Sequence, residues 1–295
     1  MGILAFLAAE RTLVDGALDR LLPPADAWPR RLHEAMRYAV FGGGKRVRPI
    51  LARAACRAAG GDPARILEAA CALELVHTYS LVHDDLPALD NDTLRRGRPT
   101  VHVAYDEALA ILVGDALLTE AFLVLGTHPA GEELAPRRAE GCRLVALAVG
   151  SAGMVGGQVE DLEATGTPPD AGRLERIHRA KTGALLAASV ELGAVLAGVD
   201  AATRQRFARF GQSLGLAFQI ADDILDVTGT AASLGKSPGK DAAAGKLTYP
   251  AVYGLAAARQ ELCRLAGALR AEAEALEGRS GTLASLVEYI ASRDR

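Results

Sequence analysis

Aromatic residues are scarce in this sequence, and it lacks the alternation of polar and apolar residues that marks β-strands. Aromatics make up 4% of the 295 residues, whereas half of the residues are hydrophobic and alanine and leucine are abundant. Both of these residues lose little free energy on entering a helix. No composition shift marks a linker, and no repeat of fixed period is evident. The sequence therefore predicts an all-α protein, with a single large helical domain over residues 1–295.

Paired cysteines, basic tracts and long apolar runs are also missing. The four cysteines are scattered through alanine- and leucine-rich segments with no CxxC pair, which is typical of small buried side chains in a reduced compartment. A net charge of −3, without a basic tract and interleaved aromatics, gives no reason to expect nucleic acid as a partner. The apolar N-terminus is short and has no basic start, and no apolar run reaches the roughly 18 residues that a spanning helix needs. We therefore expect a cytoplasmic protein with no membrane span.

Proline and glycine divide the helical pattern into segments. A mostly apolar, buried helix is expected over residues 63–85, with Asp62 as N-cap, Pro63 at its first position and Pro87 just beyond its end. A second long helix is expected over residues 201–227. Further helices are expected at 3–22, 29–41, from Pro49 to Gly60, and at 103–125, 136–155, 170–198 and 248–292, with a loop at 228–247.

Two acidic clusters stand at the ends of the two long helices. They consist of Asp84, Asp85, Asp90 and Asp92, and of Asp222, Asp223 and Asp226. Asp222 and Asp226 are one turn apart among apolar neighbours, and carboxylates are costly to bury there without a counter-charge. The carboxylates that close the first helix also oppose its macrodipole. The pattern predicts sites for a hard divalent cation or a phosphate group rather than a solvated helix face.

Basic residues form four separate patches. Gly42-Gly43-Gly44 precede the first patch, and glycine lets backbone amides approach an anion that the cations neutralise. A Walker A loop is excluded, because the glycine spacing and the Ser/Thr after the lysine are missing. The patches are Lys45 with Arg46 and Arg48; Arg95 with Arg96 and Arg98; Lys181 with Thr182; and Lys236 with Lys240 and Lys246. Metal-binding acids, separate cationic patches and long apolar helices together indicate substrates with diphosphate heads and hydrocarbon bodies.

These motifs resemble those of the trans-polyprenyl diphosphate synthases, most closely the bacterial farnesyl diphosphate synthase branch. Asp84 to Asp90 matches the DDxxxxD first motif of that family, and Asp222 to Asp226 matches the DDxxD second motif. The match extends in family order to Gly43–Pro49, Leu94–Gly97, Gly157–Leu162, Lys181–Gly183 and Gly245–Pro250. The resemblance implies a helical bundle around a deep central cavity, usually in a homodimer. It also implies condensation of isopentenyl diphosphate with dimethylallyl or geranyl diphosphate to farnesyl diphosphate.

The same resemblance assigns roles to individual residues. Several magnesium ions would be held by Asp84, Asp85, Asp90, Asp222, Asp223 and Asp226. The allylic diphosphate would be contacted by Arg95, Lys181, Lys236 and Lys246, with Thr182 and Gln219 nearby, and Lys181 counts among the catalytic residues. Isopentenyl diphosphate would be held by Lys45, Arg48, His77 and Arg96, with Arg46 as a further candidate.

Product length is expected to depend on the helical turn before the first cluster. Tyr79 and Ser80 precede Asp84 by five and four positions, so they point down the expected cavity. Tyr79 is large enough to stop a chain near fifteen carbons, although an ordinary core tyrosine is the alternative. Ser80 offers no obstacle, so a twenty-carbon product remains open.

Other functions compete with this hypothesis. A geranylgeranyl diphosphate synthase would use the same chemistry. A class I terpene cyclase also ionises an allylic diphosphate, but such enzymes usually replace the second aspartate cluster and have little use for Lys45, Arg48 and His77. An HD-type metal phosphohydrolase is suggested by His83-Asp84 but leaves the second cluster unexplained. A non-catalytic partner subunit of the same fold would be expected to have lost some of the six acids.

Overall fold

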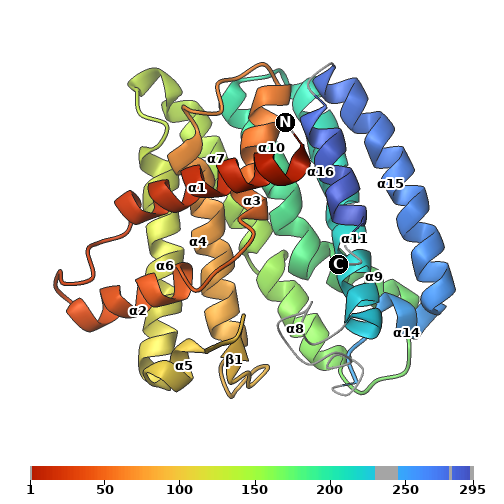
Figure 1. The fold of residues 1–295 in the computed structure, drawn as a ribbon, viewed down its shortest axis with the longest axis horizontal. Coiled ribbons are helices and arrows are strands. Elements are labelled where there is room, and N and C mark those ends of the chain that lie inside the picture. Colours follow the sequence, from red (N-terminus) through yellow and green to blue (C-terminus); the bar gives the residue numbers. More distant parts are fainter. Residues whose placement is uncertain (1, 230–244, 279–280, 293–295) are drawn as a thin grey trace.

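The computed structural model describes residues 2–229, 245–278 and 281–292, and these are helical apart from a small hairpin and the connecting loops (Figure 1). Strands β1 (Leu94–Arg95) and β2 (Arg98–Pro99) pair antiparallel. The first helices are α1 (Ile3–Leu21), α2 (Arg30–Val40), α3 (Val47–Ala58), α4 (Leu67–Asp84), α5 (Val101–Ala104) and α6 (Glu107–Thr127). They are followed by η1 (Glu132–Leu134), α7 (Ala135–Val149), α8 (Met154–Ala164), α9 (Ala171–Ile177), the π-helix η2 (His178–Gly183) and α10 (Ala184–Ala197). The last are α11 (Ala201–Thr228), α14 (Tyr249–Tyr253), α15 (Leu255–Glu277) and α16 (Thr282–Ala291).

Helices α3 and α10 join the two large apolar clusters of the core. Ala52 and Leu192 belong to the cluster around α1, α4 and α6, whereas Leu51 and Val190 belong to the cluster around α11, α15 and α16. The two helices approach closely at Gly193, where a Cβ atom would lie 2.1 Å from the carbonyl oxygen of Ala52. The all-α architecture is confirmed, while the single-domain assignment to 1–295 stays a prediction that this sharing supports.

Three helices that lead to the site begin at aspartates. The side chains of Asp106, Asp170 and Asp200 cap α6, α9 and α11 by accepting hydrogen bonds from backbone amides in the first turn. Such caps satisfy amides that have no partner inside the helix. The amides belong to Leu109, Arg173 and Thr203, at 2.7, 2.9 and 2.8 Å.

Several expected boundaries are wrong by a turn or more. Asp62 caps only a short turn, with Oδ1 accepting from the Ala64 amide at 2.9 Å, and α4 begins later, at Leu67. The helix expected over 136–155 ends at Val149, and α8 then runs straight through two glycines. A Cβ atom at the second of them, Gly157, would lie 2.3 Å from the backbone nitrogen of Lys181. Glycine there serves close helix packing and does not end the helix.

The expected absence of a membrane span stays a prediction. Within the described residues, three helical stretches are long and apolar enough to cross a membrane by length and composition alone: Glu107–Thr127, Glu132–Ala164 and Ala171–Ala197. None of the three is an uninterrupted apolar run, because each contains charged residues. Within the most apolar 18 residues of each stretch, the share that is buried in the protein is 44%, 28% and 61%, in the same order.

Candidate active site

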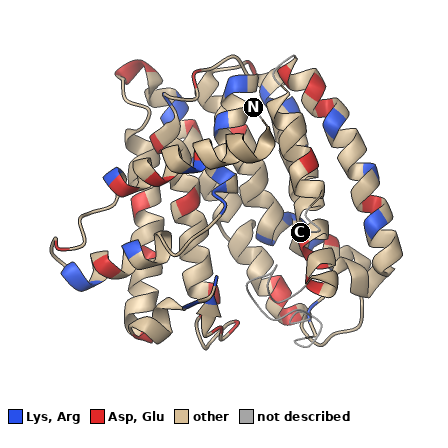
Figure 2. Ribbon diagram, viewed as in Figure 1, with Lys and Arg blue, Asp and Glu red and all other residues tan. Residues whose placement is uncertain are grey.

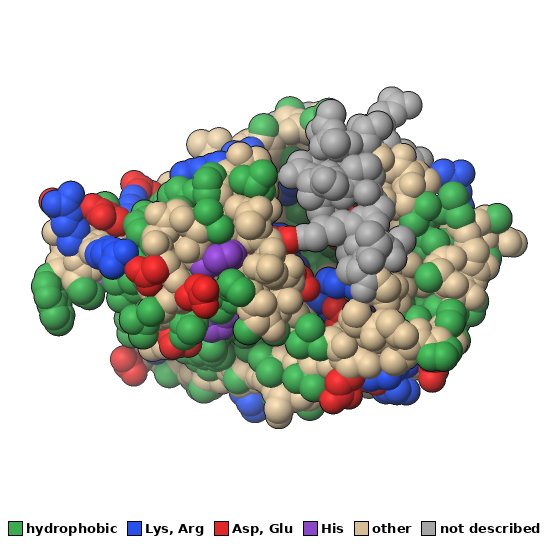
Figure 3. All heavy atoms as spheres, turned by 90° about the horizontal axis from the view of Figure 1, so that it is seen from below, with side chains coloured by type: hydrophobic (Ala, Val, Ile, Leu, Met, Phe, Trp, Pro, Cys, Tyr) green, Lys and Arg blue, Asp and Glu red, His purple; other side chains and the backbone are tan. Residues whose placement is uncertain are grey.

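The two acidic clusters lie at the C-terminal ends of α4 and α11, which both point to the lower side of the molecule in Figure 1. Asp84 is the last residue of α4, and the second cluster occupies the final turns of α11. Figure 2 shows acidic and basic positions gathered at this side, around the ends of α8, α11 and the β1–β2 hairpin. Figure 3 looks at the same side and shows acidic and basic side chains beside one another in the central hollow.

Three cavities at this end share residues. The central one, of about 390 Å³, lies between α4 and α8 and contains Asp84. A second, of about 510 Å³, lies over the glycine loop and shares Arg48 and His77 with the central cavity. A third, of about 120 Å³, contains Asp223 and shares Lys181 and Thr182 with the central cavity. The central cavity takes its apolar lining from Leu81, Leu89, Met154, Val155, Val159 and Leu162.

The first acidic cluster is paired with basic residues that the sequence assigned to the allylic diphosphate. Asp85 accepts two hydrogen bonds from Nε of Arg95, at 2.8 and 2.9 Å, and Asp90 accepts one from Nζ of Lys246 at 3.1 Å. The amide of Asp90 donates to the carbonyl oxygen of Asp84 at 2.8 Å, so the turn after α4 brings Asp90 back to the helix end. Because Lys246 follows the second cluster in the chain, its ion pair also brings that segment to the first cluster.

Asp223 of the second cluster is contacted by groups from three different segments. It is only 3% exposed, and Oδ1 accepts from Nε2 of Gln219 at 2.8 Å. Oδ2 accepts from the backbone amide of Tyr249 at 2.7 Å, and Nε2 of His178 lies 3.1 Å from the same oxygen. The rings of His178 and Tyr249 stack with their centroids 6.4 Å apart. The sequence predicted Gln219, but it missed His178 and gave Tyr249 no role beyond its place in a family motif.

Lys181 lies between the two clusters, on the π-helix η2. Its ammonium group forms an ion pair with Asp161 at 2.6 Å. Single π-turns inside helices occur often at functional sites. Gly157 of α8 and Gly215 of α11 allow close approach from both sides, because Cβ atoms there would lie 2.3 Å from Lys181 N and 2.8 Å from Gly183 Cα. Asp161 was singled out only as part of a matched motif, and the structure shows it as the partner of the predicted catalytic lysine.

Gln158 is a further residue to which the sequence assigned no role. It lines the central cavity, and both polar atoms of its side chain are buried. Among the described residues, neither atom has a hydrogen-bond partner. An unsatisfied buried amide costs free energy, so this side chain is available to a ligand in the cavity.

The glycine loop forms one wall of the second cavity. Gly43 and Gly44 have φ angles of +100° and +140°, a region that favours glycine. A Cβ atom at Gly44 would lie 2.7 Å from Nη1 of Arg96, which also donates to the carbonyl oxygen of Gly43. Lys45 and Arg48 line the same cavity. The structure therefore brings together the residues assigned to isopentenyl diphosphate.

Arg46 also lines this cavity, but protein groups already engage its guanidinium, so its candidate role as a diphosphate ligand stays a prediction. It is 3% exposed, and all three guanidinium nitrogens bond to protein groups. Nε donates to Asp15 at 2.7 Å, Nη1 to Glu74 at 2.9 Å and Nη2 to the carbonyl oxygen of Val40 at 2.8 Å. Arg46 thus ties the glycine loop to α1, α2 and α4, and it supports the neighbouring ligands from behind.

His77 contributes a neutral donor to this basic cavity. Burial lowers the pKa of His77 well below its usual value, and the nearby cations of Arg48 and Arg96 lower it further. The imidazole is therefore uncharged near pH 7. A neutral imidazole still carries one N–H group, so the predicted hydrogen bond to a phosphate remains possible for it.

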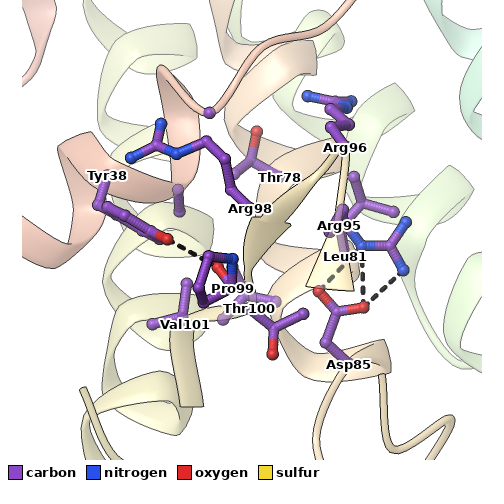
Figure 4. Close-up of a pocket in the computed structure, with 13 residues that line it drawn as sticks. Tyr38, Thr78, Leu81, Asp85, Arg95, Arg96, Arg98, Pro99, Thr100 and Val101 are labelled. Carbon is purple, nitrogen blue, oxygen red and sulfur yellow. Dashed lines mark hydrogen bonds and ion pairs between the residues drawn. The ribbon is translucent and has the colours of Figure 1, made fainter. Parts of the chain in front are cut away.

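A small cavity of about 50 Å³ lies between α2, α4 and the β1–β2 hairpin, and contacts around it hold the hairpin in place (Figure 4). The guanidinium carbon of Arg98 lies 4.2 Å from the ring centroid of Tyr38, whose hydroxyl donates to the hairpin backbone at 2.7 Å. In Figure 4, Arg95 points to Asp85 while Arg96 points the other way. The sequence prediction that neighbouring arginines serve different diphosphates agrees with this divergence.

The donor set fits magnesium bound together with a diphosphate. Magnesium is usually held by one or two carboxylates plus substrate phosphates and waters, not by an all-protein cage. In the described part of the chain, no group of three or more His, Cys, Asp or Glu side chains is arranged to hold an ion by itself. The carboxylates on either side of Lys181 and Thr182 therefore match a magnesium site that is completed by substrate phosphates, and they do not match an all-protein cage.

The pKa of Asp84 gives a testable pH dependence. Burial raises this pKa to about 6, with Lys181 acting in the opposite direction. A carboxyl group whose pKa is raised on folding destabilises the folded state at higher pH. This penalty begins to fall as the pH drops below about 6 and is gone only below the ordinary carboxyl value of 3.8. Without metal, Asp84→Asn should therefore be more stable than wild type at pH 8, by up to about 3 kcal/mol.

Chemical denaturation at pH 8 and pH 4 measures this effect. The stability difference between Asp84→Asn and wild type should shrink at pH 4 to a small fraction of its value at pH 8, because Asp84 is then neutral in the folded state and only partly ionised in the unfolded chain. Asp26→Asn, at an exposed loop position, provides the control and should show no such change. A difference that stays constant across this range would contradict the assigned titration.

Some predicted features lie elsewhere or outside the described residues. Lys236 and Lys240 fall within 230–244, which the structure does not describe. His83, the basis of the phosphohydrolase alternative, has Nε2 3.0 Å from the carbonyl oxygen of Ile111 on α6. It is thus engaged away from Asp84, which removes the main support for an HD metal site.

Comparisons with known proteins agree with this geometry. The family model described as polyprenyl synthetase matches residues 29–280. A farnesyl diphosphate synthase of Geobacillus stearothermophilus is 43% identical over 98% of this chain and 97% of its own length. A geranylgeranyl diphosphate synthase of Cyanophora paradoxa is 41% identical over 99% of this chain and 97% of its own.

Solved structures show the same likeness. An FPP/GFPP synthase from Zymomonas mobilis superimposes with a TM-score of 0.86 at 37% identity, covering 98% of this chain and 99% of the other. A Helicobacter pylori geranyltransferase, solved in complex with magnesium and isoprenyl diphosphate, gives a TM-score of 0.85 at 31% identity, covering 98% and 96%. The chain belongs to the polyprenyl synthetase family.

Proposed function

We propose that this protein is a magnesium-dependent prenyltransferase that condenses isopentenyl diphosphate with dimethylallyl and geranyl diphosphate to form farnesyl diphosphate. One observation carries the proposal. An apolar cavity of about 390 Å³ lies between two charged cavities. Arg48 and His77 line both the apolar cavity and the basic one. Lys181 and Thr182 line both the apolar cavity and the one that contains acidic and basic residues. Two diphosphate heads bound at these sides would place both hydrocarbon chains in the same apolar space.

The residues at each side have distinct tasks in this reaction. Lys45, Arg48, Arg96 and His77 hold the diphosphate of the five-carbon nucleophile. Lys181, Arg95 and Lys246 neutralise the allylic diphosphate once it displaces Asp161, Asp85 and Asp90 from them. Magnesium, held by the two aspartate clusters when bound, supplies further positive charge to the leaving group.

The bond changes follow from this placement. The allylic C–O bond breaks, and the leaving diphosphate keeps the electron pair while cationic side chains stabilise its charge. The double bond of isopentenyl diphosphate attacks the allylic cation, a C–C bond forms, and a proton is lost to the departing diphosphate. Apolar side chains from α4 and α8 exclude the water that would otherwise trap the cation.

Tyr79 supports the farnesyl product over the geranylgeranyl alternative. Its ring is 6% exposed and lines the central cavity together with Ser80, whose hydroxyl donates to the carbonyl oxygen of His77 at 2.9 Å. Tyr79→Ala removes this floor, and we expect the ratio of twenty- to fifteen-carbon product to rise by about tenfold. Chromatography of the products measures the ratio. Tyr105→Ala, outside the cavity, is the control, and an unchanged distribution in Tyr79→Ala would place the floor elsewhere.

We further propose a homodimer in a reducing, cytoplasmic compartment. Ile111, Leu112 and Leu123 on α6 and Leu147 on the adjacent α7 are between 47% and 61% exposed, so a partner would bury them. Exposed apolar patches of this kind mark interaction sites. All four cysteines are free, which agrees with a reducing compartment.

The activity is tested with purified protein, isopentenyl diphosphate and each allylic starter, with and without magnesium, with products identified by mass. Farnesyl diphosphate and one equivalent of released diphosphate per new C–C bond are expected only with magnesium. Release of phosphate without a longer product would favour a hydrolase, and a cyclic hydrocarbon formed from farnesyl diphosphate would favour a cyclase.

A further inference from the structure

His83 occupies a notch on the neighbouring helix α6, beside the central cavity. It lies four residues after Tyr79 on α4, so the two side chains share one helix face. Their rings contact edge to face, with centroids 5.8 Å apart, and both line the central cavity. His83 is therefore part of the cavity wall between the reacting end at Asp84 and the floor at Tyr79.

Two contacts hold the His83 ring against α6. Nε2 lies 3.0 Å from the carbonyl oxygen of Ile111, and because a carbonyl can only accept, Nε2 carries the proton. The ring also fills the space left by the missing side chain of Gly114. A Cβ atom at Gly114 would lie 2.0 Å from Nε2, 2.3 Å from Cδ2 and 2.7 Å from Cε1 of the ring. No real Cβ atom is tolerated at such distances, so any larger residue would force the ring away from α6.

A His83 ring displaced from α6 would lie next to the central cavity. The ring lines the central cavity and is held against α6 through Ile111, so we expect displacement from α6 to move it toward the apolar space of about 390 Å³. On the basis of the proposed function, we propose that the His83–Gly114 contact sets the depth of the product cavity, with Gly114 keeping the His83 ring out of the path of the growing chain. Product length then depends on this pair of helices as well as on the size of Tyr79.

Four variants test the inference through product length. Gly114→Ala should push the ring into the cavity and lower the ratio of fifteen- to ten-carbon product by about tenfold, as expected when an apolar pocket loses the space of a few methylene groups. The double variant His83→Ala/Gly114→Ala removes the clashing ring and should restore products at least as long as those of wild type. His83→Ala alone should give products at least as long as wild type even if Gly114→Ala does not fold. Gly126→Ala is the matched control on the same helix, because a Cβ atom there meets nothing within 4 Å.

The outcomes separate this inference from the proposed function. If wild type forms no longer prenyl diphosphate, the proposed function fails. If wild type elongates but Gly114→Ala gives an unchanged distribution, the inference alone is overturned. It is equally overturned if the double variant stays as short as Gly114→Ala, because α6 itself would then have moved, or if His83→Ala alone shortens the product.

Discussion

Alanine at Asp84 or at Asp222 is expected to lower turnover by about a thousandfold while the helical fold persists. Asp84 ends α4 and faces the central cavity, and Asp222 lies on α11 beside the firmly held Asp223. Each loss removes a carboxylate from one side of the leaving diphosphate. Because the two clusters lie on different helices, similar losses from both would show that they act on the same group.

Steady-state rates at saturating substrate measure these losses, and circular dichroism reports the fold. Asp26→Ala, in the exposed loop between α1 and α2, should retain wild-type turnover. Full activity of either active-site variant in excess magnesium would contradict the metal assignment. A drop in helical content would show instead that the carboxylate supports the fold.

Methionine at Arg46 is expected to destabilise the protein by about 3–5 kcal/mol. Glu74 would then be left buried without its partner, since the two side chains are 2% and 3% exposed and 2.9 Å apart. Most of this cost comes from the uncompensated charge. The double variant Arg46→Met/Glu74→Leu should therefore recover much of the stability, because apolar residues of similar volume can replace a buried ion pair.

Urea denaturation distinguishes these variants, and kinetics add a second readout. The Michaelis constant for isopentenyl diphosphate should rise more than that for the allylic substrate, because Arg46 supports the glycine loop. Arg30→Met breaks an exposed pair with Glu34 whose atoms lie 2.8 Å apart, and it should cost far less stability than Arg46→Met because solvent screens the pair. Equal costs at the two positions would contradict the structural role given to Arg46.

Much of the site could be predicted because its chemistry is visible in local patterns. Aspartates one turn apart among apolar residues, as at Asp222 and Asp226, are costly unless they bind something, and this signal needs no tertiary information. The same is true of Gly43 and Gly44 before basic residues. Composition also predicted helices, so α11 was found with almost its observed bounds. Helix α4 was found too, but it begins about a turn later than expected.

The missing parts depend on contacts between distant segments. Arg46 and Arg48 look alike in sequence, but only the positions of Asp15 and Glu74 on other helices reveal that Arg46 is structural. His178 has no special local pattern, and its role follows from its contact with Asp223. The passage of α8 through glycine could not be foreseen either, because its cause is the closeness of Lys181 on a helix later in the chain.

The central claim is tested most directly by measuring, with calorimetry, how tightly an unreactive allylic diphosphate analogue binds with and without magnesium. The claim is that both aspartate clusters hold the allylic diphosphate through magnesium. Wild type should bind the analogue at least about tenfold more tightly with magnesium, a difference of about 1.4 kcal/mol, and Asp84→Ala and Asp222→Ala should each lose this gain. Binding that is equally tight without magnesium, or a full magnesium effect in either variant, would contradict the account.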